Sequence, residues 1–190
     1  MPDQRGITGL ETAIVLIAFV VVSSVFAFAA LSTGLFSSDV AKQTIQAGLA
    51  ETRGTLELKG SVIARVTGTT GTTGAKVSTI VFHVSNAAAG EAIDLTPGNT
   101  VIKYSDKSQT VIMNSTTNFS STNISAFGDT DTLLETGEVF EIILLDLVGQ
   151  LDPDLTTNAE FSIEVIPPRG AVLFSGRRTP VSLEKSNNLD

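Results

Sequence analysis

The stretch Ala13–Leu31 (AIVLIAFVVVSSVFAFAAL) is nearly continuous hydrocarbon, and no charged residue occurs between Thr12 and Ser38. As a helix it would be roughly 28 Å long, close to the hydrocarbon thickness of a bilayer. In an apolar medium the backbone must satisfy its own hydrogen bonds, and the two serines can bond to carbonyls one turn earlier. The sequence therefore predicts a helix that enters a membrane at some stage.

Three fates are open to this helix: a permanent anchor, a secretory signal peptide, or a segment that leaves the lipid and packs against copies of itself. Arg5 would give a signal peptide its basic start, and Ala27–Ala29 is an A-x-A cleavage candidate. The apolar run, however, is longer than the roughly 7–15 residues expected of a signal peptide.

A different signal precedes the apolar run, in Arg5–Glu11 (RGITGLE). It resembles the class III signal of type IV pilin-like precursors, in which a prepilin-type peptidase cuts after the glycine. Cleavage between Gly6 and Ile7 would leave the whole helix on the mature chain. Glu11 is costly near hydrocarbon unless it finds a partner. In such families a carboxylate here can meet the terminal amine of a neighbouring subunit, and the alternative is an ordinary acidic residue in a first helical turn.

The helical period continues beyond the apolar run while the composition turns polar. We expect a single helix from about Leu10 to about Leu58, roughly 73 Å long. The predicted division is a leader at 1–6, a helix at 7–59 and an outer domain at 60–190. One apolar stripe carries the continuation, at Ala41, Ile45, Leu49, Thr52 and Leu56.

From Ser61 onward the hydrophobic period changes to two, and turn residues become frequent. The fold class is therefore α+β, a long hydrophobic N-terminal helix followed by an antiparallel, Ig-like β-sandwich. The predicted strands are Val62–Val66, Lys76–Ser85, Thr100–Tyr104, Thr110–Met113, Glu138–Val148, Phe161–Val165 and Val172–Phe174.

Composition argues against most enzymes and against nucleic acid. The net charge is −8, whereas phosphate backbones require a basic surface. Cysteine is absent, so thiol nucleophiles and disulfides are excluded, and His83, the one histidine, is expected to be structural. The sequence predicts no catalytic residue and no cofactor.

Other motifs in the outer domain are weak. Gly68–Lys76 does not meet the phosphate-loop pattern, because Lys76 is followed by valine. The carboxylate pairs in Asp129–Asp131 and Asp152–Asp154 offer oxygen ligands for a cation but lack the rest of a calcium loop. The pair Arg177–Arg178 is either a solvated surface pair or a contact for an acidic neighbour in an assembly.

Three N-x-S/T sequons crowd together at Asn114, Asn118 and Asn123, in a stretch rich in serine and threonine. Such a composition is typical of an exposed loop, and each asparagine could accept an N-linked glycan. Chance occurrence is the alternative, because the chain is rich in both hydroxyl residues. We expect at least one of the three to be glycosylated.

The whole pattern resembles the archaellins, subunits of the archaeal motility filament. The resemblance implies a helical filament core, a solvent-facing β-sandwich and assembly with copies of itself or with other archaellins. It further implies a prepilin-type peptidase, an export and motor platform, a precursor in the cytoplasmic membrane and an extracellular filament. The matching residues are Arg5–Glu11, Leu31–Phe36, Gln43–Leu49, Phe82–Ala88 and Ile93–Thr96.

Two other functions remain open from the sequence. Archaeal adhesion pilins share the same signal and helix, so the N-terminus does not separate them from archaellins. A secreted or anchored β-sandwich binding protein would be cut at Ala29 or not at all.

Overall fold

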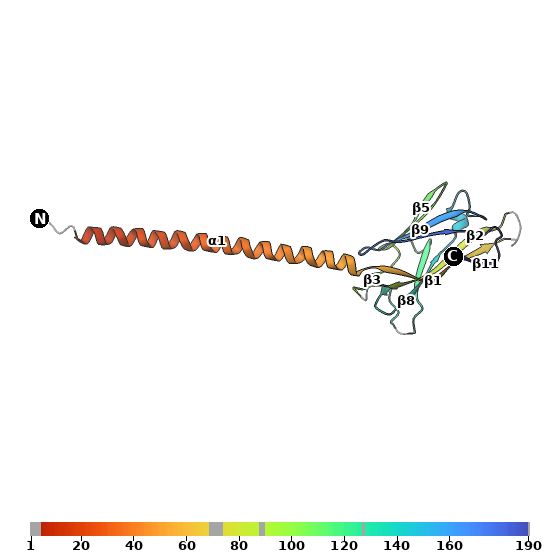
Figure 1. Cartoon of the computed structure of the whole chain (residues 1–190), viewed down its shortest axis with the longest axis horizontal. Helices are drawn as coiled ribbons and strands as arrows, with labels where there is room; N and C mark the ends of the chain where they lie inside the picture. Colours follow the sequence, from red (N-terminus) through yellow and green to blue (C-terminus); the bar gives the residue numbers. More distant parts are fainter. Residues whose placement is uncertain (1–4, 69–73, 88–89, 127, 190) are drawn as a thin grey trace. The chain divides into compact units, whose positions relative to one another are not determined.

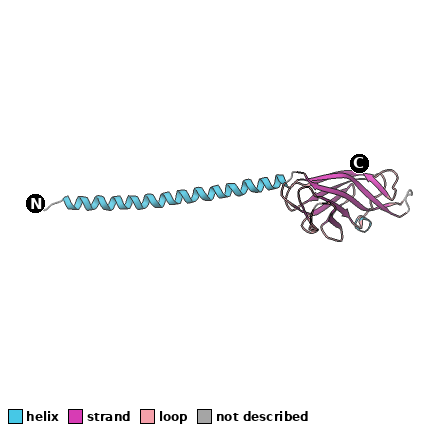
Figure 2. Cartoon of the chain, turned by 90° about the horizontal axis from the view of Figure 1, so that it is seen from below, coloured by secondary structure: helices cyan, strands magenta, loops and turns pink. Residues whose placement is uncertain are grey.

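The computed structural model describes residues 5–68, 74–87, 90–126 and 128–189, and for 5–8 and 50–53 it describes the backbone only. The chain divides into two compact units, Met1–Ala47 and Gly48–Asp190. The first unit is helical, and the second contains the strands (Figures 1 and 2). In chain order the elements are α1 (Arg5–Arg53), β1 (Leu56–Thr67), β2 (Lys76–Asn86), β3 (Ile93–Asp94), β4 (Val101–Asp106), β5 (Thr110–Met113), β6 (Phe119–Asn123), β7 (Leu133–Leu134), β8 (Val139–Leu144), α2 (Leu147–Gln150), β9 (Glu160–Ile166), β10 (Leu173–Arg178) and β11 (Ser186–Leu189).

The helix α1 ends at Arg53, before the predicted end near Leu58. Leu56 and Leu58 instead lie in β1, opposite Asn86 and Val84 of β2, and Leu56 is buried. Leu56, the last residue of the apolar stripe that predicted a longer helix, therefore belongs to the sheet and not to the helix. Burial in a sandwich core and pairing with β2 outweigh the local helical periodicity of these residues.

The strands form two main antiparallel sheets. One has the order β11-β1-β2-β8-β6, the other has the order β10-β9-β4-β5, and β3 and β7 pair separately. Buried side chains of both main sheets belong to one apolar core, including Phe82 and Ile142 from the first sheet and Tyr104 and Ile163 from the second. This arrangement confirms the predicted antiparallel β-sandwich.

Strand β8 ends at Leu144, earlier than the predicted end at Val148. The chain turns because Asp146 takes a left-handed conformation with φ of 47°, and Leu147 then starts the short helix α2 with its side chain fully buried. An apolar run that looks like one strand is therefore a strand followed by a short helix whose first residue is buried.

The two edge strands of the first sheet, β6 and β11, could not be predicted from their own sequences. Strand β6 pairs with β8, with Phe119 opposite Leu144, where the sequence predicted an exposed loop. Strand β11 pairs with β1, and Leu189 lies opposite Val62. Their polar residues have little strand propensity, so the pairing depends on the neighbouring strand and on one or two buried apolar side chains.

Two glycines bring backbone segments into close contact at the start of the second unit. The carbonyl of Gly54 accepts a hydrogen bond from the N–H of Ala171 at 3.0 Å. Gly170 has a φ of +101°, and a Cβ placed there would lie 1.8 Å from the Gly54 oxygen. Only glycine at 170 permits this approach.

Candidate functional site: the apolar helix and the head surface

The helix α1 carries no buried side chain between residues 9 and 49, all of which the structure describes. Its large hydrophobic side chains, from Leu10 to Leu49, are each at least 45% exposed. An ordinary surface helix has one apolar stripe, whereas this one is apolar on every side from Ala13 to Leu31. Such a surface needs to be covered by lipid or by other protein chains. Residues Gly9–Leu49 are long and apolar enough to cross a membrane.

Several hydroxyl groups within α1 donate hydrogen bonds to carbonyl groups of the helix itself. Ser24, one of the two serines in the apolar stretch, donates to the Val21 carbonyl at 2.8 Å, as predicted. Thr33 donates to the Ala29 carbonyl at 2.9 Å in the same way. These side chains therefore do not prevent α1 from entering an apolar environment.

The predicted processing signal lies at the beginning of α1. The helix starts at Arg5, so the backbone of Gly6 and Ile7 is helical, while their side chains and residues 1–4 lie outside the described part of the chain. Glu11 is exposed in the second turn of the helix. Cleavage after Gly6 and the pairing of Glu11 stay predictions.

The three sequon asparagines lie in different environments. Asn114 follows β5 and is exposed, whereas Asn118 is half-buried just before β6. Asn123 lies in β6, and its Nδ2, the atom that would carry a glycan, donates to Glu138 Oε1 at 2.8 Å and to the Asp129 carbonyl at 3.3 Å. The prediction that one exposed loop carries all three asparagines is wrong, because Asn123 lies in the strand β6.

Three of the four aspartates in the two carboxylate pairs use one carboxylate oxygen for a contact within the chain. Asp129 Oδ1 accepts the N–H of Asp131 at 3.1 Å, and Asp131 Oδ1 accepts the N–H of Leu133 at 2.8 Å. Asp154 forms an ion pair with Lys76. Among the residues that the structure describes, no three histidine or carboxylate side chains gather in a metal-binding group.

His83 lies on β2 directly opposite Glu141 of β8, with 3.7 Å between its Nε2 and Glu141 Oε2. Both side chains are about one quarter exposed. The geometry is that of a cross-strand pair on a sheet face. The stretch Gly68–Lys76 does not meet the phosphate-loop pattern. Its residues 69–73 lie outside the described part of the chain, and its last residue, Lys76, begins β2.

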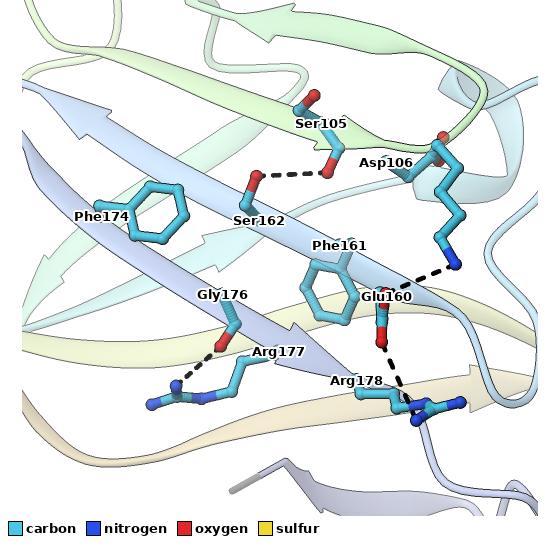
Figure 3. Close-up of a pocket in the computed structure, with 10 residues that line it drawn as sticks. Ser105, Asp106, Glu160, Phe161, Ser162, Phe174, Gly176, Arg177 and Arg178 are labelled. Atoms are coloured by element: carbon cyan, nitrogen blue, oxygen red, sulfur yellow. Dashed lines mark hydrogen bonds and ion pairs between the residues drawn. The ribbon is translucent and has the colours of Figure 1, made fainter.

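A feature that sequence reasoning missed is an open hollow of about 580 Å³ on the outer face of the β10-β9-β4-β5 sheet (Figure 3). Its floor is the row Ser105, Ser162 and Gly176, which strand register places side by side. These three residues are small, whereas Phe174 in the next row has a large side chain that is 64% exposed. Only strand register could have revealed this row.

The cationic groups near the hollow outnumber the free carboxylates. Glu160 lies between Lys107, at 3.5 Å, and Arg178, at 3.9 Å. The Arg177 Nη1 donates to the Gly176 carbonyl at 2.9 Å, and its Nε is buried without a hydrogen-bond partner. This side of a strongly acidic chain is therefore locally basic.

Asp106 also lines the hollow, and its carboxylate accepts hydrogen bonds from residues of the β4–β5 turn. Burial alone would raise the pKa of Asp106, but the N–H groups of Ser108 and Gln109, the Gln109 amide and the Tyr104 hydroxyl all donate to the carboxylate and lower its pKa. Burial, the Asp106 charge and this hydrogen bond raise the pKa of Tyr104. The carboxylate therefore holds a turn and adds little free negative charge to the hollow.

A second aspartate holds a turn in the same way. Burial raises the pKa of Asp94, but hydrogen bonds from Thr96 and Asn99 outweigh it and lower the pKa. The Thr96 N–H donates at 2.9 Å and the Asn99 amide at 2.7 Å. Both aspartates therefore hold turns in the second unit (Gly48–Asp190), which we call the head.

A sequence model of the archaeal-type flagellins matches residues 6–174. The chain belongs to the archaeal-type flagellin family. Probable flagellin 1 of Aeropyrum pernix is 33% identical to this flagellin, over 96% of each chain. Probable flagellin 1 of Archaeoglobus fulgidus is 31% identical, over 97% of this chain and 94% of the relative.

Solved structures agree on the fold. The archaeal flagellum of Methanospirillum hungatei matches with a TM-score of 0.72 and 21% identity, over 95% of this chain and 98% of that chain. The crystal structure of an archaeal flagellin from Methanocaldococcus jannaschii matches with a TM-score of 0.57 and 14% identity, over 70% of this chain and 95% of that one.

The family match confirms the resemblance drawn from the sequence. This flagellin is a structural subunit of the archaeal motility filament, an extracellular fibre. The match favours this function over the adhesion pilin and the secreted binding protein that the sequence had left open.

Proposed function

We propose that this flagellin polymerises through α1 after its leader is removed between Gly6 and Ile7. The observation that carries the proposal is the surface of α1, which is exposed from residue 9 to residue 49 and is apolar on every side from Ala13 to Leu31. Packing such helices together gives each one apolar neighbours all round, which a single chain does not provide. The filament core is then a bundle of α1 helices.

Burial supplies the free energy of assembly. Removing apolar surface from water contributes about 25 cal/mol per Å². Transfer from lipid into a helix bundle gains less, because lipid tails are as apolar as the side chains. Close packing between helices then has to supply the difference.

The same proposal names the partners of the precursor. A prepilin-type peptidase cuts after Gly6, with Arg5 as the basic residue of the signal, while α1 anchors the precursor in the cytoplasmic membrane. Glu11 then meets the new terminal amine of a neighbouring subunit. An export and motor platform assembles the filament, to which other flagellins can contribute, and the subunit itself performs no catalysis.

The variant Val21→Asp tests the packing of α1. Val21 is 53% exposed in the middle of the apolar stretch. One aspartate costs about 2.5–3.5 kcal/mol at the centre of a membrane-inserting helix, which the other apolar residues outweigh, so export continues. In a helix bundle the carboxylate would be buried without a partner in every subunit, so filaments should be absent.

Val181→Asp is the matched control, because Val181 is 82% exposed in the second unit. It should give filaments at the parental yield under the electron microscope. Filaments of normal yield from Val21→Asp would refute assembly through α1.

The processing step has its own test. We expect the N-terminal sequence of the extracellular protein to start at Ile7, with an intact mass that lacks residues 1–6. A start near Ala30 would mean that the apolar helix is an ordinary signal peptide, and the proposed filament core would fail with it.

We also propose that the chain is a glycoprotein and that Asn114 carries the N-linked glycan. Its exposure supports this choice over Asn123, whose Nδ2 already donates two hydrogen bonds in the folded head. A glycan at Asn114 would keep the surface near the edge strand β5 solvated.

A further inference from the structure

The hollow on the outer face of the β10-β9-β4-β5 sheet has both an apolar and a basic side. One row across this face consists of Ile112, Lys103, Glu164 and Phe174, with Lys103 and Glu164 joined by an ion pair at 3.2 Å. Ile112 and Phe174 are 60% and 64% exposed. The next row forms the small-residue floor, and the basic groups lie beyond it. A partner that fits this face carries acidic and apolar groups together.

Lys107 and Arg178 are available to such a partner. Their side chains are 81% and 56% exposed, and both form ion pairs with the single carboxylate of Glu160. Two cations on one exposed carboxylate leave an excess positive charge, to which Arg177 adds another. The excess occurs in a chain with a net charge of −8, so another copy carries more acidic than basic side chains.

The segment 128–135 has the complementary character. Asp129, Asp131 and Glu135 are exposed, and no lysine or arginine of the described residues forms an ion pair with any of them. Leu133, within the same segment, is 39% exposed. One short segment therefore offers three carboxylates and an apolar side chain.

This segment is held in shape before any contact forms. Buried Glu138 accepts hydrogen bonds from Asn123 Nδ2 at 2.8 Å and from the N–H of Glu135 at 2.9 Å. A Cβ at Gly128 would lie 2.1 Å from Glu138 Oε1, so the loop packs directly on this carboxylate. A preorganised loop loses less conformational entropy on binding than a flexible loop does.

The segment and the hollow lie on different parts of the head. Strand β7 in the segment pairs with β3, which Figure 1 shows on the lower side of the head, whereas β5 and β9 lie on the upper side. Two different complementary patches on one molecule produce a heterologous contact, which repeats without closing and generates helical polymers.

We propose that the hollow binds the segment 128–135 of a second copy of this chain. The inference rests on the proposed filament function and adds a contact between heads to the packing of α1. Lys107, Arg177 and Arg178 then meet the carboxylates of the neighbour, and Phe174 meets its Leu133. The Arg177–Arg178 pair thereby gains the acidic neighbour that the sequence left as an alternative.

Cross-linking within filaments tests the contact, and the absence of native cysteine makes the result unambiguous. The double variant Ser162→Cys, Thr130→Cys places one thiol on the floor of the hollow and one in the segment, and both changes preserve the local charge. Treatment of its filaments with a short bismaleimide should give a ladder of covalent oligomers on a denaturing gel. Each single variant should remain monomeric, because a heterologous contact brings unlike positions together.

The outcomes separate this inference from the proposed function. Double-variant filaments that assemble but give no ladder overturn the head contact and leave assembly through α1 intact. A ladder from Thr130→Cys alone also overturns it, since two segments would then face each other. A parental chain that forms no filaments refutes the proposed function, and the head contact falls with it.

Charge reversal gives a second measurement that needs no cysteine. Lys107→Glu with Arg178→Glu should lower the temperature at which filaments dissociate. Adding Asp129→Lys and Asp131→Lys should restore it. Failure of the second pair to restore that temperature would overturn the contact.

Discussion

Replacing Gly170 with alanine should destabilise the head more than any loss of side-chain contact at the surface would. The new Cβ would lie 1.8 Å from the Gly54 oxygen, 2.6 Å from its carbonyl carbon and 2.9 Å from its Cα. All three are backbone atoms, so no side-chain rotation can relieve the clash. The two segments must separate.

The expected magnitude follows from what the separation removes. The hydrogen bond from Ala171 to the Gly54 carbonyl, 3.0 Å long, is lost at about 0.5–1.5 kcal/mol. A non-glycine residue at a φ of +101° adds about 1–3 kcal/mol of backbone strain. We therefore expect the free energy of unfolding to fall by about 2–4 kcal/mol.

Gly137→Ala is the matched control, because Gly137 has a φ of +91° but no atom within 4 Å of its ideal Cβ. It carries the backbone strain without the clash, so the difference between the two variants measures the close approach itself. Urea unfolding of the full chain in mild detergent provides the assay. Fluorescence reports only the head, since the chain has no tryptophan and its one tyrosine, Tyr104, is fully buried there.

Equal losses in the two variants would refute the reasoning, because they would mean that the contact between residues 54 and 170 contributes nothing. A larger loss for Gly137→Ala would refute it as well.

Two further predictions concern single side chains of the head. The pKa of Asp106 is lowered in the folded state, so its stabilisation is complete above its ordinary value of 3.8 and is lost as pH falls through the folded pKa. Asp106→Asn should therefore unfold at lower urea than the parent at neutral pH, and the gap should shrink in titrations below pH 3.8; a gap independent of pH would contradict this assignment. Intact mass should show that Asn114→Gln removes glycan from the extracellular protein while Asn123→Gln leaves it, and the reverse pattern would exclude Asn114 as the acceptor.

The apolar helix could be predicted from the sequence because its signal is local. A charge-free stretch from Thr12 to Ser38 requires a helix in an apolar medium, whatever surrounds it. The same is true of β2, where apolar and β-branched residues dominate between Lys76 and Asn86. Composition and period, which the sequence displays directly, determine these elements and the family resemblance that begins with Arg5–Glu11.

Tertiary structure alone decided the end of α1, the strand β6 and the outer-face hollow. Leu56 continues a helical stripe, yet it is buried in a strand because β2 offers it a partner at Asn86. Phe119 and its polar neighbours form a strand because β8 lies beside them. The row Ser105, Ser162 and Gly176 exists only through the register of three strands far apart in sequence. A single sequence shows what each residue prefers, but pairing across strands fixes which residues become neighbours, and that choice depends on the energy of the whole core.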